Sequence, residues 1–218
     1  MDLDELAEGF RVRFDARMQA RERALAAARR GVRSCANAIR ALHRGERDVA
    51  HTLMDEARAS IADGLDAVRD HPEIRFAGYL QDAQKEYAEA RITEALVIGA
   101  DAIPGVNAIP GADELGVEDA PYLNGMAEAI GEGRRFALDL LRQGQVNRAE
   151  AVLASMEELY AVLVSIDYPD AITGNLRRTT DVARSLIEKT RGDVTTAIGQ
   201  RDLREALDRH GRTVLGEG

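Results

Sequence analysis

Aromatic residues are scarce in this chain of 218 residues: they make up 4% of it, and tryptophan is absent. Apolar residues still account for 45%, which is enough to build the core of one large domain. A core with so few rings must consist of Ala, Leu, Val and Ile, a composition that suits close packing of helices. We therefore expect a single domain over residues 1–218. The scarcity of rings also weakens any surface on which nucleic-acid bases would stack.

Cysteine is nearly absent as well. Cys35 is the single cysteine, so no disulfide can form within the chain, and no motif of a catalytic thiol surrounds it. The sequence shows neither the apolar core of a signal peptide nor an apolar run near the roughly 18 residues needed to cross a bilayer. We therefore predict a cytoplasmic protein in a reducing compartment, without membrane association.

Lysine occurs only at Lys85 and Lys189, so nearly all cations are arginine, and the net charge is −9. This acidic balance argues against non-specific binding of a nucleic-acid duplex over the whole surface. Residues 9–45 nevertheless contain ten arginines and two acidic residues, a local charge of +8. Such a cluster is typical of a nucleic-acid contact or of a solvated helix face, and charge alone does not distinguish the two.

Strand-like alternation of polar and apolar residues is absent, and the five prolines lie where helices should begin or where the chain loops. The sequence therefore predicts an all-α fold, a bundle of about seven helices. We place these helices at residues 3–43, 48–68, 72–99, 121–144, 146–166, 170–190 and 199–210. An irregular connection at 101–119 should hold a helical turn near 113–115. The stripe of apolar residues along 146–166 is the strongest, which indicates core or a subunit interface.

Two pairs of glutamates lie on separate predicted helices. Glu86 and Glu89 are three residues apart, and Glu128 and Glu132 are four apart, so each pair points to one side of its helix. Carboxylates are hard ligands suited to Mg²⁺ or Mn²⁺, and ions held in this way can activate water against a phosphodiester. The spacing is equally compatible with solvated surface. On a helical wheel the second pair lies opposite its apolar stripe, which favours solvent exposure unless that face lines a wet interior of an assembly.

Four segments together resemble one protein family. Residues 84–90 (QKEYAEA) and 122–132 (YLNGMAEAIGE) are similar to segments of translin-associated factor X, and residues 175–181 (NLRRTTD) and 187–193 (IEKTRGD) to segments of its prokaryotic relatives. The resemblance covers about residues 71–193, with the segments in the same order. It implies a seven-helix all-α domain of the translin type that assembles into a closed, roughly octameric homo-oligomer.

The resemblance also implies an activity. Members of this family bind single-stranded RNA or DNA, and the factor X type members cleave RNA with Mg²⁺. The carboxylates that carry cleavage match Glu86, Glu89 and Glu128, with Glu132 as a further acidic neighbour, so these four are the expected ligands of Mg²⁺ or Mn²⁺. Glu128 stands where the family usually has the shorter Asp, which changes the coordination geometry.

We expect phosphate contacts from Arg177, Arg178, Arg75 and Lys85, together with some of the N-terminal arginines. Lys85 stands beside Glu86, so it can pair with a carboxylate or with a phosphate. Two other functions remain open from the sequence: a non-catalytic protein of the same fold that binds single-stranded nucleic acid, and a helical scaffold without a nucleic-acid role.

Overall fold

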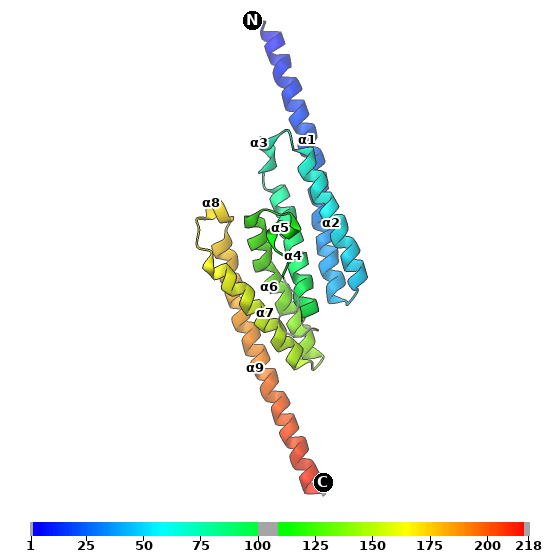
Figure 1. Cartoon of the computed structure of the whole chain (residues 1–218), viewed down its shortest axis with the longest axis vertical. Coiled ribbons are helices and arrows are strands. Elements are labelled where there is room, and N and C mark those ends of the chain that lie inside the picture. The colour runs from blue at the N-terminus through cyan, green and yellow to red at the C-terminus, as the bar shows by residue number, and fades with distance from the viewer. Residues whose placement is uncertain (1, 100–108, 216–218) are drawn as a thin grey trace.

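The computed structural model describes residues 2–99 and 109–215, and within these ranges the chain forms nine helices and no strand. The all-α prediction is therefore confirmed. Six long helices form the bundle: α1 (Leu3–His43), α2 (Arg47–Ala67), α4 (Tyr79–Gly99), α6 (Asp119–Arg142), α7 (Val146–Ser165) and α9 (Leu176–Leu215) (Figure 1). Three single turns lie in the connections: α3 (Pro72–Arg75), α5 (Ala112–Leu115) and α8 (Asp170–Thr173). Among the helices described, none combines the length and apolar character that crossing a membrane requires.

Glycines end two of the long helices where the sequence indicates it. Gly45 follows α1 with φ +77°, and Gly144 follows α6 with φ +73°, a backbone conformation that favours glycine. At the other end of α1, the side chain of Asp2 accepts the N–H of Asp4 at 2.9 Å, which satisfies one of the free donors of the first turn. Tight turns at Gly45 and Gly144 let α1 pack against α2, and α6 against α7.

The predicted helix at 72–99 is wrong in one respect, because the structure divides it into α3 and α4. Gly78 between them has φ +96°, and the hydroxyl of Tyr79 donates to the carbonyl of Ile74 at 3.0 Å, which holds the bend. The turn predicted near 113–115 is confirmed as α5. The part of the connection at 100–108 lies outside the described residues.

The predicted boundaries near the C-terminus are also wrong. The chain bends at Gly174 and Asn175, both with positive φ, and then continues as one helix, α9, instead of two. Gly192 and Gly199 lie inside α9. A glycine in a helix interior costs only about 1 kcal/mol, and packing of α9 against α6 and α7 outweighs that cost.

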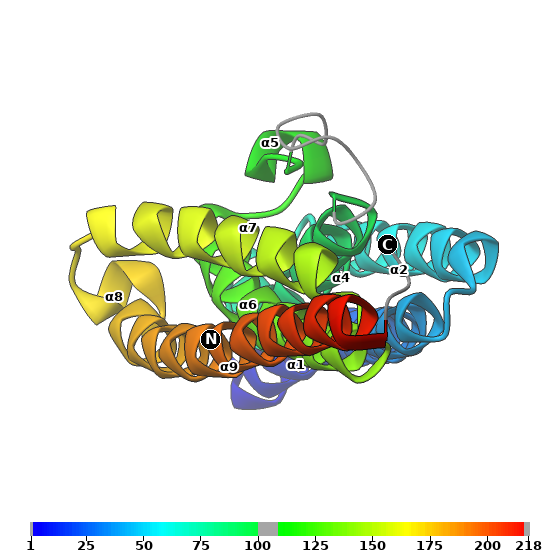
Figure 2. The ribbon, with the colours of Figure 1, turned by 90° about the horizontal axis from the view of Figure 1, so that it is seen from below.

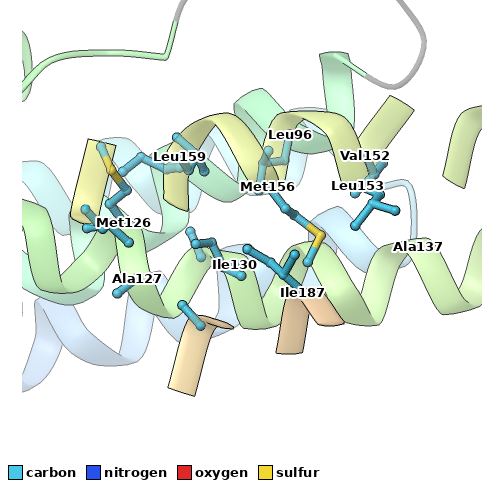
Figure 3. Packing of buried hydrophobic residues seen from close by; sticks show 14 of the residues in the cluster. Leu96, Met126, Ala127, Ile130, Ala137, Val152, Leu153, Met156, Leu159 and Ile187 are labelled. Carbon is cyan, nitrogen blue, oxygen red and sulfur yellow. The ribbon is translucent and has the colours of Figure 1, made fainter. Parts of the chain in front are cut away.

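Two clusters of buried apolar side chains form the core. The C-terminal cluster joins α6, α7 and α9 with the end of α4, and Ile130, Met156 and Ile187 meet in it (Figure 3). The N-terminal cluster joins α1, α2 and the first half of α4. The stripe predicted on 146–166 faces the C-terminal cluster, so it is core. Helices α4 and α6 pack directly against each other where the two clusters meet.

Both terminal helices extend beyond the bundle, in opposite directions along its long axis (Figure 1). The first residue of α1 that is fully buried is Ala20, so the preceding turns project from the bundle. Viewed from below, α2 lies at one side of the molecule and α8 at the other (Figure 2).

Candidate metal centre

The candidate site begins with a very close approach of two helices. A Cβ atom on Gly125 of α6 would lie 2.5 Å from the carbonyl oxygen of Lys85 and 2.9 Å from the Cβ of Ala88, both on α4. No side chain fits into that space, so glycine is required for the two backbones to approach this closely. The approach places the carboxylates of α4 and α6 within reach of each other.

Three carboxylates meet beside this contact. Glu86 and Glu89 project from α4 and Glu128 projects from α6, and one oxygen of each lies within 4.8 Å of the others. All three side chains are half-buried. We call Glu86, Glu89 and Glu128 the carboxylate triad. The structure thus brings together the three residues named as catalytic from the sequence, while their catalytic role stays a prediction.

The surroundings favour the protonated form of two of these carboxyl groups. Burial raises the pKa of Glu89 to about 8, and the charges of Glu86, Glu128 and Glu132 add to that effect. Burial also raises the pKa of Glu86, against the opposing effect of Lys85. Desolvation and like charges both disfavour an ionised carboxylate, so a cation bound among these groups would favour their ionised form.

Lys85 is the cation that contacts the triad. Its Nζ atom lies 2.9 Å from Oε1 and 2.8 Å from Oε2 of Glu128, and 3.4 Å from Oε1 of Glu86. Burial alone would lower the pKa of Lys85, but the hydrogen bond and charge of Glu128 and the charge of Glu86 outweigh it and raise the pKa. In this structure Lys85 therefore pairs with carboxylates.

The donor set fits a divalent cation. Lys85 supplies one positive charge beside three carboxylates. When all three are ionised, an excess of negative charge therefore remains in half-buried surroundings. The available donors are all hard oxygens, which suits Mg²⁺ or Mn²⁺ and not a thiophilic metal. Residues Glu86, Glu89 and Glu128 are the ones that could hold such an ion.

Glu132 lies one turn beyond Glu128 but points to a different partner. Its Oε2 atom lies 2.5 Å from Nε2 of His43 at the end of α1 and 3.7 Å from Nη1 of Arg135. The hydrogen bond from His43 lowers the pKa of Glu132, so this carboxylate is ionised. Its charge raises the pKa of Glu89. Glu132 is therefore a charged neighbour of the triad, and its role as a ligand stays a prediction.

His43 is a residue that sequence reasoning missed. Its side chain is 5% exposed and its ring lies near that of Phe136, so α1, α4 and α6 all contribute to the surroundings of the triad. A histidine in the last turn of a helix suggests an interaction with that helix's own carbonyl groups. Nothing in the local sequence indicates a partner 89 residues away.

The arginines expected to contact phosphate lie on other elements. Arg177 and Arg178 are exposed in the first turn of α9, where Arg177 pairs with Asp167 at 2.7 Å. Arg75 on α3 lies 3.3 Å from Glu118. Of the four basic residues named from the sequence, only Lys85 reaches the triad.

Two of the motif segments are joined by a buried amide. Asn124 donates to the carbonyl oxygens of Ala120 at 2.9 Å and Thr173 at 2.8 Å, and it accepts the hydroxyl of Thr179 at 3.1 Å. These bonds fasten α6 to α8 and to the start of α9. The segments at 122–132 and 175–181 therefore share a structural role, because a buried amide must find partners for its polar atoms.

Cys35 lies on α1, buried near the triad. Burial raises the pKa of its thiol above the ordinary value, and the charges of Glu86 and Glu89 raise it further. The thiol thus stays protonated and unreactive, in line with the absence of a catalytic-thiol motif around it.

Comparison with known proteins supplies relatives of similar length and fold, although no family model matches the chain. The uncharacterized protein MJ0175 of Methanocaldococcus jannaschii is 34% identical over 191 residues, which cover 87% of this chain and 81% of that protein. A structure of AfC3PO in complex with duplex RNA superposes with a TM-score of 0.78 at 31% identity, over 89% of this chain and 97% of that one.

Two further structures agree with this. A second structure, a crystal structure of AfC3PO, has a TM-score of 0.77 at 31% identity, over 89% of this chain and 98% of that one. A crystal structure of apo-NeC3PO has a TM-score of 0.73 at 22% identity, over 90% of this chain and 97% of that one, and shows the fold alone. Since the C3PO proteins are translin-like and the likeness extends over nearly the whole chain in sequence and in fold, this chain belongs to the translin family.

Proposed function

We propose that this protein is a metal-dependent endoribonuclease of the translin-associated factor X type that cleaves single-stranded RNA. The observation that carries the proposal is the meeting of three carboxylate oxygens within 4.8 Å across α4 and α6. Glu86, Glu89 and Glu128 would hold Mg²⁺ or Mn²⁺. When bound, such an ion supplies Lewis-acid catalysis and lowers the pKa of a water for attack on the phosphodiester.

Each residue of the site then has a distinct task. Glu89, with a pKa of about 8, holds a proton at neutral pH and must release it when a cation binds. Lys85 pairs with Glu128 through its Nζ atom, and it would be free to pair with a phosphate oxygen if Glu128 held an ion. Glu132, kept ionised by His43, adds negative charge that attracts the cation.

Binding of RNA is supported by the relatives. AfC3PO has been solved with duplex RNA, and its identity to this chain is high enough to propose that this protein binds RNA too. Preference for a single strand rests on the resemblance of the four motif segments. The exposed Arg177 and Arg178 and the half-buried Arg75 would contact phosphates away from the site of cleavage. We further propose a homo-oligomer, roughly octameric, that encloses the carboxylate faces of its subunits.

A cleavage assay with paired variants tests the activity. Labelled single-stranded RNA would be incubated with the protein in Mg²⁺ and in chelator, and the Glu89→Gln variant would be compared with Glu157→Gln. Glu157 is a partly exposed glutamate on α7 that pairs with Arg191, so its variant controls for loss of a carboxylate elsewhere. We expect Glu89→Gln to lose at least about 100-fold in rate and to bind RNA as before. The proposal would be contradicted if Glu89→Gln cleaved RNA at the wild-type rate, or if the wild type cleaved RNA equally fast in chelator and in Mg²⁺.

A non-catalytic RNA-binding protein is the second candidate. The ion pair from Lys85 to both oxygens of Glu128 favours it, because Lys85 then occupies the position of the cation. This candidate predicts RNA binding that weakens steeply with salt, no Mg²⁺-dependent products, and no binding of Mn²⁺ to the purified protein by calorimetry. Mg²⁺-dependent cleavage products that Glu89→Gln abolishes would exclude it.

A further inference from the structure

The projecting part of α1 has an apolar stripe that nothing in the described chain covers. We call residues 3–18 the α1 tip. Its stripe residues recur every three or four positions, which places them on one face of the helix, and their exposed fractions run from 38% to 75%. They are Leu3, Leu6, Phe10, Phe14 and Met18.

Contacts within the tip cover only part of this stripe. The rings of Phe10 and Phe14 stack at 6.5 Å, and the guanidinium groups of Arg13 and Arg17 lie 4.8 Å and 5.7 Å from these rings. Phe14 is still 59% exposed. A helical segment of about 16 residues is only marginally stable in water without tertiary packing, so a partner that buries the stripe would also stabilise the helix.

Charge along the tip indicates what the partner is. Its beginning and the residue before it carry four acidic residues and no basic one: Asp2, Asp4, Glu5 and Glu8. The rest of the tip, residues 9–18, carries three arginines against one acidic residue. A second α1 tip that runs in the opposite direction places the acidic part of each copy against the basic part of the other. A parallel arrangement would place like charges together.

The stripe has the same symmetry as the charges. Phe10 lies at the middle of the interval from Leu3 to Met18, so a twofold axis near Phe10 would bring Leu3 of one copy against Met18 of the second. An interface of this kind is self-complementary, as closed dimers require. We propose that two copies of this chain associate through their α1 tips as an antiparallel pair of helices.

The projecting end of α9 is the competing occupant. Leu203 and Leu207 on it are each 60% exposed, but acidic and basic residues alternate there without the division into two halves seen on the α1 tip. The end of α9 lies at the opposite end of the molecule (Figure 1), so contact between α1 and α9 of different copies would join molecules head to tail.

The molar mass in solution tests the association. Light scattering on the full chain would compare wild type with a Phe10→Glu/Phe14→Glu variant and with Val12→Glu. Val12 is 60% exposed in the same segment but lies off the stripe, so its variant controls for an added charge. We expect the double variant to have half the mass of wild type or less, and Val12→Glu to match wild type. An unchanged mass for the double variant overturns the proposal. The core begins at Ala20, so each subunit of the double variant should stay folded and still unfold cooperatively on heating.

Disulfide cross-linking tests the direction. Under mild oxidation Phe10→Cys should form a disulfide-linked dimer, whereas Leu3→Cys alone should not and a mixture of Leu3→Cys with Met18→Cys should. The native Cys35 is fully buried and should stay out of the reaction. Cross-linking of Leu3→Cys with itself overturns the antiparallel arrangement. Cross-linking of Phe10→Cys only with Leu203→Cys assigns the tip to α9 and overturns the pairing of two α1 tips.

Discussion

Replacing Gly125 by alanine should separate the two helices that form the candidate site. The new Cβ would lie 2.5 Å from the carbonyl oxygen of Lys85 and 3.0 Å from the backbone nitrogen of Glu89. Ordinary contacts begin near 3.4 Å, so α4 must move by about 1 Å, since backbone atoms of a helix cannot swing aside as a flexible side chain does. Overpacking of this kind costs about 1–3 kcal/mol, and removal of a helical glycine returns at most about 1 kcal/mol.

The same movement should weaken cation binding. Mg²⁺ requires oxygens at about 2.0–2.1 Å in near-octahedral geometry, so a displacement of about 1 Å between Glu89 on α4 and Glu128 on α6 should lower affinity for Mn²⁺, used as the probe, about tenfold or more. Urea unfolding would measure the loss of stability, and calorimetry would measure the affinity.

A second glycine on α6 provides the control. A Cβ on Gly131 would meet only the Cδ1 atom of Leu186, at 3.7 Å, which is an ordinary contact. Gly131→Ala should therefore leave Mn²⁺ binding unchanged and stabilise the fold by up to about 1 kcal/mol. If Gly125→Ala proves as stable as Gly131→Ala and binds Mn²⁺ like wild type, the close approach of the helices does not shape the site.

Three further predictions follow from the polar contacts. Because the pKa of Glu89 in the folded protein is raised to about 8, the free energy of unfolding without metal should fall as pH rises from about 5 to about 8.5. Urea unfolding at these two pH values would measure the fall, which should be smaller in the Glu89→Gln variant. Lys85→Gln removes the ammonium group that pairs with Glu128, so it should increase the affinity for Mn²⁺ in calorimetry. A lower affinity would show that Lys85 supports the geometry of the site. Asn124→Ala should cost about 2–3 kcal/mol in urea unfolding, because it leaves the carbonyl of Thr173 without its buried donor, and a neutral effect would contradict the fastening role.

The convergence of the triad could be anticipated only in part from the sequence. The spacing of Glu86 and Glu89 predicts that both lie on one side of a helix. The helical wheel of α6, however, predicts that Glu128 is exposed, because Glu128 lies opposite the large apolar residues. The structure shows that this opposite face is also packed: Gly125 lies on it and admits α4. Glycine has no side chain to contribute to an apolar stripe. The periodicity of apolar residues therefore cannot predict a helical face that packs by means of a glycine.

Other differences come from contacts between segments distant in the chain. The hydrogen bond between His43 and Glu132 depends on how α1 crosses α6, which no local pattern specifies. The continuation of α9 through Gly192 depends on packing that outweighs a weak local preference. By contrast, the ends of α1 and α6 could be predicted, because Gly45 and Gly144 act through their own backbone conformation.

The position of the triad between the two apolar clusters has a consequence for cooperativity. The N-terminal cluster involves α1, α2 and the first half of α4, and the C-terminal cluster involves α6, α7 and α9. A cation held by Glu86, Glu89 and Glu128 would link α4 to α6, and so the helices of the N-terminal cluster to those of the C-terminal cluster. It would therefore act as a reversible cross-link within the chain: any partial unfolding that separates the halves must first release the ion, so metal concentration would set how far the molecule unfolds as a single unit.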